Sequence, residues 1–162
     1  MPTFIKFDGI DGESSTEGFE KWTEVLSFSF GVGRGISHAG STSTREGSVA
    51  SVSEIVVHKV TDGTTVKYFK EALCGELDNT VQIAMVRTGS GKPEKFLGFE
   101  LTNTGVSGIS FSAAGGPGVD SRPSETLSFN FSKVQLEYLP IGNDLTGSPD
   151  RYTWDMAKGT GS

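Results

Sequence analysis

The side chains able to do chemistry are few in this 162-residue chain. Its only imidazoles are His38 and His58, and its only thiol is Cys74. No Cys or second His lies at metal-ligand spacing from either histidine, so both are expected to be structural. Cys74 could be a nucleophile only if a histidine and an acid met it in space. Nothing nearby in the sequence activates it, and we expect a small buried hydrophobe at the end of a helix.

Three acidic residues, Asp8, Asp11 and Glu13, cluster in the segment DGIDGES. Carboxylates in a turn suggest calcium, but this segment lacks the ligand spacing and the distal glutamate of an EF-hand loop. It therefore predicts a solvated turn.

Two glycine-rich stretches resemble phosphate-binding loops only in composition. GVGRG at residues 31–35 lacks the third glycine and the following helix of a dinucleotide site. GSGKP at residues 89–93 has Val86 in place of the first glycine of a Walker A loop, and Pro93 in place of its Ser or Thr. We therefore expect no catalytic residue, no metal and no cofactor, and a hairpin turn at residues 89–93.

The charge balance argues against nucleic acid as a partner. The chain has 14 basic and 20 acidic residues, for a net charge of −6, whereas phosphate neutralisation needs clustered Lys and Arg. The N-terminus lacks the basic and apolar regions of a Sec signal, and no apolar stretch approaches the ~18 residues of a membrane span. We expect a protein made in the cytoplasm, with no membrane insertion.

The elements that must position these side chains are mostly strands. Apolar and polar residues alternate most clearly at residues 25–30, where Leu26, Phe28 and Phe30 share one face. The same pattern predicts strands at residues 3–7, 52–60, 81–87, 95–102, 105–112 and 126–139. The 22 glycines and 11 phenylalanines also favour an all-β chain, because turns and strand-forming aromatics are abundant.

The last predicted strand contains a change of phase. Its apolar residues are odd-numbered up to Phe131 and even-numbered from Val134. Such a slip moves the apolar face across the sheet unless an extra residue is accommodated. A bulge near Ser132 and Lys133 would accommodate it, which predicts a strongly curved strand.

One helix is expected over residues 64–74. Three apolar residues recur there at helical spacing: Val66, Phe69 and Leu73. Thr64 is the expected N-cap, and Gly75 the expected left-handed residue after the helix. One short helix among seven or eight strands indicates a small barrel or sandwich, and the length indicates a single domain over residues 1–162.

Several segments together resemble one protein family. The chain opens with FIKFDGIDGES at residues 4–14, continues with WTEVLSFSFGVG at 22–33, and ends with SETLSFNFSKVQLEYLP at 124–140 and YTWDM at 152–156. In this order they are similar to the haemolysin-coregulated protein (Hcp) family, the tube subunit of bacterial type VI secretion systems. The resemblance covers nearly the whole chain. The chain departs from the family at Phe19 and Glu20, where many members carry a His-Lys pair.

The resemblance implies a fold and a function. Family members form a small β-barrel of two curved antiparallel sheets with one helix at the side, as do phage tail-tube proteins. They assemble as homo-hexameric rings that stack into a tube, and a contractile sheath drives the tube outward with a spike protein and effectors. The resemblance therefore implies a non-enzymatic structural subunit that the type VI system exports.

The long polar segment at residues 31–51 shows neither the alternation of a strand nor the spacing of a helix. Loops above about 12–15 residues are usually functional or disordered. We hypothesise that it contacts neighbouring subunits or rings, against the alternative of a flexible surface loop. The candidate contact residues are Arg34, His38, Arg45 and Glu46.

Three other functions compete with a secretion tube. The first is a phage-type tail-tube or related injection-particle subunit, which shares the mechanics. The second is a secreted β-sandwich ligand-binding module such as a lectin, with exposed aromatics around Trp22 or Trp154. The third is an enzyme with an unrecognised site, which the failed motif search disfavours.

Overall fold

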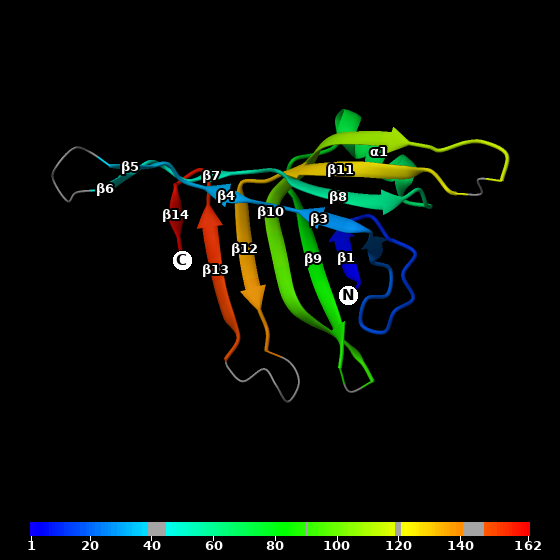
Figure 1. Cartoon of the computed structure of the whole chain (residues 1–162), viewed down its shortest axis with the longest axis horizontal. Helices are drawn as coiled ribbons and strands as arrows, with labels where there is room; N and C mark the ends of the chain where they lie inside the picture. Colours follow the sequence, from blue (N-terminus) through cyan, green and yellow to red (C-terminus); the bar gives the residue numbers. More distant parts are fainter. Residues whose placement is uncertain (39–44, 90, 119–120, 141–147) are drawn as a thin grey trace.

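The computed structural model of the protein describes residues 1–38, 45–89, 91–118, 121–140 and 148–162. Regular structure in these residues is almost entirely β, with one helix, α1 (Thr65–Cys74) (Figure 1). The strands are β1 (Thr3–Phe7), β2 (Thr23–Val25), β3 (Ser27–Ser29), β4 (Val32–Gly33), β5 (Ile36–His38), β6 (Arg45–Gly47), β7 (Ser51–Val52), β8 (Ile55–Val60), β9 (Asn79–Thr88), β10 (Pro93–Ser112), β11 (Ser124–Asn130), β12 (Lys133–Tyr138), β13 (Asp150–Asp155) and β14 (Thr160–Gly161). The prediction of a mostly β fold with one short helix is confirmed.

Two antiparallel sheets share the longest strand, β10. The first sheet has the order β14–β13–β12–β10–β9–β1–β2, and the second has the order β10–β11–β8–β3. In Figure 1 the first sheet runs down the page and the second runs across it, so the sheets cross and enclose the core. The expected pair of curved antiparallel sheets is therefore confirmed. Among the described residues, β2, β3 and β14 are the outermost strands.

β10 is one continuous strand where the sequence predicts two. Its core-facing side chains change parity along its length, from Leu101 to Val106 to Ile109. Each change coincides with a shift of register, the first before Thr104 and the second between Val106 and Gly108. An extra residue bends a strand and changes which face its side chains take. The two shifts therefore let one strand serve both sheets.

The strand predicted at residues 126–139 is in fact two strands, β11 and β12. Both pair with β10, but β11 does so in the second sheet and β12 in the first. The chain turns between the sheets at the buried Phe131 and at Ser132, whose N–H donates to the Thr102 carbonyl at 3.1 Å. The change of phase thus marks a change of sheet, and the prediction of a bulged, curved strand is corrected.

The strand predicted at residues 25–30 also divides, into β2 and β3. Val25 is buried on the first sheet, and Phe28 packs against the core from the second. Leu26 lies at the crossing and is 65% exposed, while its N–H donates to the His58 carbonyl at 2.6 Å. Phe28 and Phe30 face the core as expected, but Leu26 does not.

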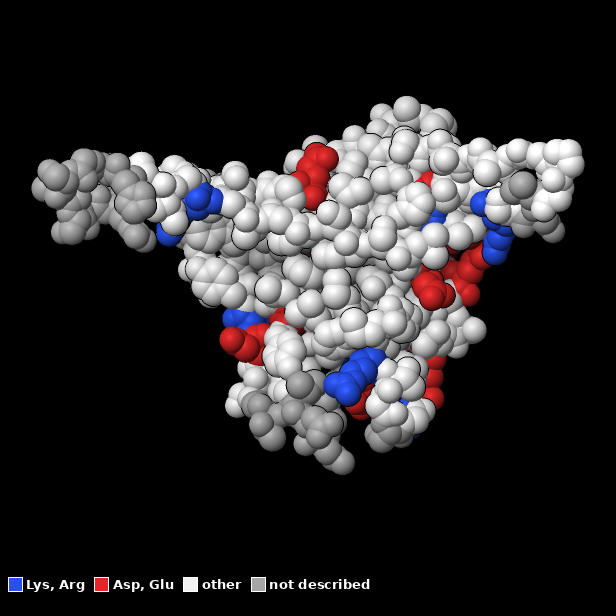
Figure 2. Space-filling model, in the orientation of Figure 1, with Lys and Arg blue, Asp and Glu red and all other residues white. Residues whose placement is uncertain are grey.

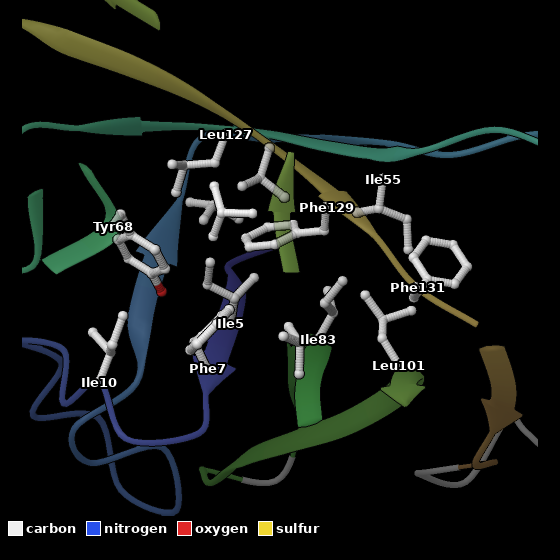
Figure 3. Packing of buried hydrophobic residues seen from close by; sticks show 14 of the residues in the cluster. Ile5, Phe7, Ile10, Ile55, Tyr68, Ile83, Leu101, Leu127, Phe129 and Phe131 are labelled. Carbon is white, nitrogen blue, oxygen red and sulfur yellow. The ribbon is translucent and has the colours of Figure 1, made fainter. Parts of the chain in front are cut away.

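Aromatic side chains join the two sheets at the centre of the core (Figure 3). The ring of Phe7 in β1 lies 5.8 Å from Tyr68 in α1 and 6.3 Å from Phe129 in β11. Each of these three side chains is almost completely buried. A smaller cluster covers part of β1 and β9, where Phe19 stacks on Phe4 at 5.2 Å and meets Trp22 at 5.3 Å. The chain thus uses Phe19 as a packing residue.

The helix ends differ from the prediction. The Thr64 side chain makes no capping hydrogen bond; instead Asp62 accepts hydrogen bonds from the N–H and the hydroxyl of Thr64. Gly75 has φ −73°, so it is extended and not left-handed. A Cβ at this position would overlap Glu71, and this close approach is the reason for a glycine. Cys74 is exposed, so the expectation of a buried thiol is wrong.

A buried ion pair fixes the start of α1 to the second sheet. Lys59 in β8 and Glu125 in β11 are both fully buried, and Lys59 Nζ lies 2.7 Å from Glu125 Oε1 and 3.0 Å from Asp62 Oδ1. The Thr65 hydroxyl donates to Glu125 Oε2 at 2.8 Å. Every charge in this group therefore has an opposite charge or a hydrogen-bond donor beside it.

Candidate assembly surfaces

The segment predicted as a structureless loop is a projecting two-stranded ribbon. We call residues 31–53 the arm, of which residues 31–38 and 45–53 are described. β4 pairs with β7 and β5 pairs with β6, and each pair forms a sheet of its own. The Gly31 N–H donates to the Ser53 hydroxyl at 2.9 Å, which closes the ribbon at its base. Figures 1 and 2 show the arm extending away from the body.

The arm exposes apolar side chains. Val32, Ile36 and Val49 are 68%, 57% and 84% exposed. A two-stranded ribbon is only marginally stable alone in water, and these side chains gain nothing from facing solvent. They form a surface that a second protein could cover.

The predicted contact residues all lie on the arm. The Arg34 side chain lies over Gly47, where a Cβ would be 3.1 Å from Arg34 Nε. The β5–β6 register places His38 opposite Arg45, and Glu46 opposite Ser37. The side chains of His38, Arg45 and Glu46 lie outside the described residues. The arm thus brings all four positions to one extended element, and their contacts stay a prediction.

A second uncovered apolar surface lies on α1. Only Tyr68 in the helix is buried, whereas the three residues that indicated the helix, Val66, Phe69 and Leu73, face solvent. We call these three with Leu77 and Phe111 the α1 stripe. Phe111, from the end of β10, lies 6.4 Å from Phe69 between ring centroids. The spacing predicted the helix correctly, but it did not show which face of the helix would be buried.

A third uncovered surface lies where the first sheet extends past the second. β12 and β13 pair side by side, with Leu136 opposite Tyr152. Both side chains are exposed, as is Tyr138 on the same face. Sequence alternation marks these residues as one face of a sheet, but only the structure shows that no strand of the second sheet covers them.

The opposite face of the first sheet is polar. Glu137 in β12 accepts a hydrogen bond from Lys95 at 2.9 Å and another from Arg151. The hydrogen bond from Lys95 holds the pKa of Glu137 below its usual value, with the charges of Lys95 and Arg151 adding to the effect against partial burial. A shallow groove of about 260 Å³ runs over this face beside Phe19 and Trp22.

The groups considered for chemistry have ordinary structural roles. His58 Nδ1 lies 2.9 Å from the Thr126 hydroxyl. Asp11 pairs with Lys6 at 2.7 Å, and Glu13 accepts the Gly63 N–H at 3.1 Å. Among the described residues no group of three or more His, Cys, Asp or Glu could hold a metal ion.

Neither tryptophan stands free on the surface as a ligand platform. Trp22 packs on Phe19, and Trp154 packs on the core. In the part of the chain that the structure describes, no helix is long and apolar enough to cross a membrane. The secreted ligand-binding alternative therefore has little support from the positions of Trp22 and Trp154.

Two crossed antiparallel sheets sharing one strand, with a projecting arm and one lateral helix, define a class of small β protein with large uncovered surfaces. Residues 4–138 match the family model described as type VI secretion system effector, Hcp. The chain belongs to the Hcp family of type VI secretion proteins.

Individual relatives agree with this assignment. The chain is 27% identical over 155 residues to protein hcp1 of Pseudomonas aeruginosa strain PAO1, covering 94% of this chain and 93% of the relative. A solved structure described as a type six secretion system protein superposes with a TM-score of 0.88 at 28% identity, covering 99% of both chains. Hcp1 from Salmonella typhimurium has the same fold, with a TM-score of 0.75 at 23% identity over 99% of this chain and 98% of that one.

Proposed function

We propose that the protein is a structural subunit of the type VI secretion inner tube, without catalytic activity, and that it forms hexameric rings which stack. The observation that carries this proposal is the arm: an Hcp-family chain places three exposed apolar side chains on an element that its own body does not cover. No described residue covers them, and burial by a second molecule would remove them from water.

The sheet edges support the same conclusion. The first sheet has β2 and β14 as its outermost strands, and the second has β3. Unpaired edges are liable to pair with other chains, and closure into a ring removes them. A head-to-tail contact that closes gives a ring, and a further contact between rings gives a filament from one type of subunit.

The proposal includes the route and the partners. The chain leaves the cell through the type VI system. Its partners are identical copies, then the sheath, spike and effector proteins of that system, and neither nucleic acid nor membrane. A phage-type tail tube would use the same assembly.

Size-exclusion chromatography with light scattering tests the assembly. We expect a mass of about six times the 17.2 kDa of one chain, and electron microscopy of concentrated samples should show rings and stacks. A clean monomer at high concentration would overturn the proposal.

A shortened arm tests the contact hypothesis. Replacing residues 35–46 by Gly-Gly removes the candidate residues His38, Arg45 and Glu46 and should leave both main sheets folded, because β5 and β6 pair only with each other. We expect the far-ultraviolet spectrum to persist and tubes to be lost. Arg34→Glu should weaken assembly, whereas Lys158→Glu, a charge reversal on an exposed residue outside the arm, should not. Normal tubes from the shortened chain would reject the hypothesis.

A further inference from the structure

We propose that the α1 stripe of one copy is the surface that receives the arm of an adjacent copy. This inference rests on the proposed self-assembly and adds the identity of the receiving surface. The stripe is an apolar surface on a helix that has only one buried side chain. Its five members, Val66, Phe69, Leu73, Leu77 and Phe111, are between 46% and 76% exposed.

The stripe and the arm match in shape and chemistry. Val66, Phe69 and Leu73 follow a spacing of three and four residues, which places them in one line along the helix. The seven residue steps from Val66 to Leu73 span ~10 Å along a helix. The four residue steps from Val32 to Ile36 span ~13 Å along an extended chain. The line of apolar side chains on the arm is thus about as long as the line on the helix.

The end of α1 has the charge that suits Arg34, while the exposed Lys67 and Lys70 lie earlier in the helix. Arg34 lies between Val32 and Ile36, and it is exposed. The last turn of α1 has no basic residue, and the exposed Glu76 and Asp78 follow it. The carboxyl end of a helix also carries a partial negative charge. An arm lying along the stripe would therefore have a favourable place for Arg34 near this end.

One molecule cannot make this contact with itself. Figure 1 shows the arm projecting from one end of the long axis, while α1 lies in the other half of the molecule beside β11 and β8. The contact must therefore join two copies through two different surfaces. Such head-to-tail contacts propagate from copy to copy, as a ring or a filament requires.

The native thiol provides a direct test, because Cys74 is the last residue of α1 and is exposed. We expect assembled Ile36→Cys protein treated with a short bis-maleimide to give a ladder of covalent multimers on a denaturing gel. The same substitution with Cys74→Ser should give at most dimers. Lys92→Cys, which places the new thiol in the exposed turn between β9 and β10, should give no ladder.

Substitution of the stripe tests it a second way. Phe69→Ser and Leu73→Ser change exposed side chains, so the free energy of unfolding should change little. The protein concentration needed for assembly should rise at least tenfold. Lys92→Ser, which changes an exposed residue in the turn between β9 and β10, outside the stripe, the arm and the outermost strands, should assemble normally. Glu76→Arg should weaken assembly, and the additional change Arg34→Glu should restore part of it.

The outcomes separate this inference from the proposed function. If the unmodified protein stays monomeric, the proposed function fails, and the inference fails with it. If the unmodified protein assembles but the Ile36→Cys chain gives no ladder and the stripe variants assemble normally, only this inference is overturned.

Discussion

At the scale of single residues, the opening motif has a packing explanation in Gly12. The Gly12 N–H donates to the Lys21 carbonyl at 2.7 Å, and a Cβ at this position would overlap the carbonyl of Trp22 and the hydroxyl of Thr23. The two backbone segments can approach this closely only if residue 12 has no side chain. The turn DGIDGES thus brings the loop carrying Phe19 onto the sheet.

Gly12→Ala should lower the free energy of unfolding by about 1–3 kcal/mol, the usual penalty for overpacking. Urea denaturation measures this change. Gly31→Ala is the matched control, because a Cβ there meets nothing within 4 Å. Equal stability of the two variants would contradict the close-packing explanation.

The ion pair between Lys59 and Glu125 is the most sensitive polar contact in the core. Glu125→Gln leaves the fully buried Lys59 without its nearest partner, and removing one member of a buried pair destabilises by about 3–5 kcal/mol. Lys59→Met with Glu125→Leu removes both charges and should recover much of that loss. Lys92→Met, which breaks the exposed pair with Glu17, should change stability by about 0–1 kcal/mol. Urea unfolding of the unmodified protein and these three variants measures the order of their stabilities.

Asp62 predicts a loss of stability in acid. Partial burial raises the pKa of this carboxyl, but hydrogen bonds from Thr64 and Lys59 outweigh burial and hold the pKa below the ordinary 3.8. A folded-state pKa below the unfolded one gives stability that is present above pH 3.8 and is lost as the pH falls through the folded value. Asp62→Asn should therefore be less stable at neutral pH, and its deficit should shrink below pH 3.8. A deficit that is constant with pH in urea titrations would contradict this.

At the scale of elements, the sequence predicted the kinds of structure better than their limits. The predictions were correct for the strands at residues 3–7 and 81–87 and for the helix at 64–74. In each segment the apolar residues keep one spacing up to a clear end of the element. The hairpin turn at residues 89–93 was also correct, since β9 and β10 pair from Thr88 and Pro93. The change of phase near Ser132 was visible, but alternation cannot distinguish a bulge from a change of sheet. The break at Leu26 was not predicted, because residues 25–30 alternate without interruption.

The candidate surfaces were less predictable for a physical reason. Exposure depends on which element covers which, and this is a property of the whole arrangement. Val66, Phe69 and Leu73 look like a core face by their spacing, yet Tyr68 takes that place because it meets Phe7 and Phe129. Residues 31–51 lack alternation because the described part of their ribbon has no buried side chain in one copy. The contact residues proposed on it came from length and charge alone.

The arm should change most on assembly. Amides of the arm should exchange fast in monomeric protein at low concentration. The four short strands of the arm form two separate two-stranded sheets and expose their side chains. In assembled protein we expect the same amides to exchange at least tenfold more slowly. Amides of β9, inside the first sheet, should be protected in both states, and an arm that exchanges equally fast in both would contradict its burial.

At the scale of the whole molecule, β10 connects the two main sheets. It pairs with β9 and β12 in the first sheet and with β11 in the second, and its 20 residues run through both. Neither sheet can lose this strand and persist. We therefore expect a single cooperative transition, with tryptophan fluorescence and far-ultraviolet circular dichroism giving coincident urea curves. Two separate transitions would show that the sheets unfold independently.

A shared strand also decides how the molecule would respond to a pull. Tension applied at the tip of the arm enters the second sheet at its base and reaches the first sheet through the backbone of β10, without crossing a hinge. Such a subunit behaves as one rigid block under strain. In a column of such blocks the weak points are the joints between copies, so a rupture should separate the copies and leave each one folded.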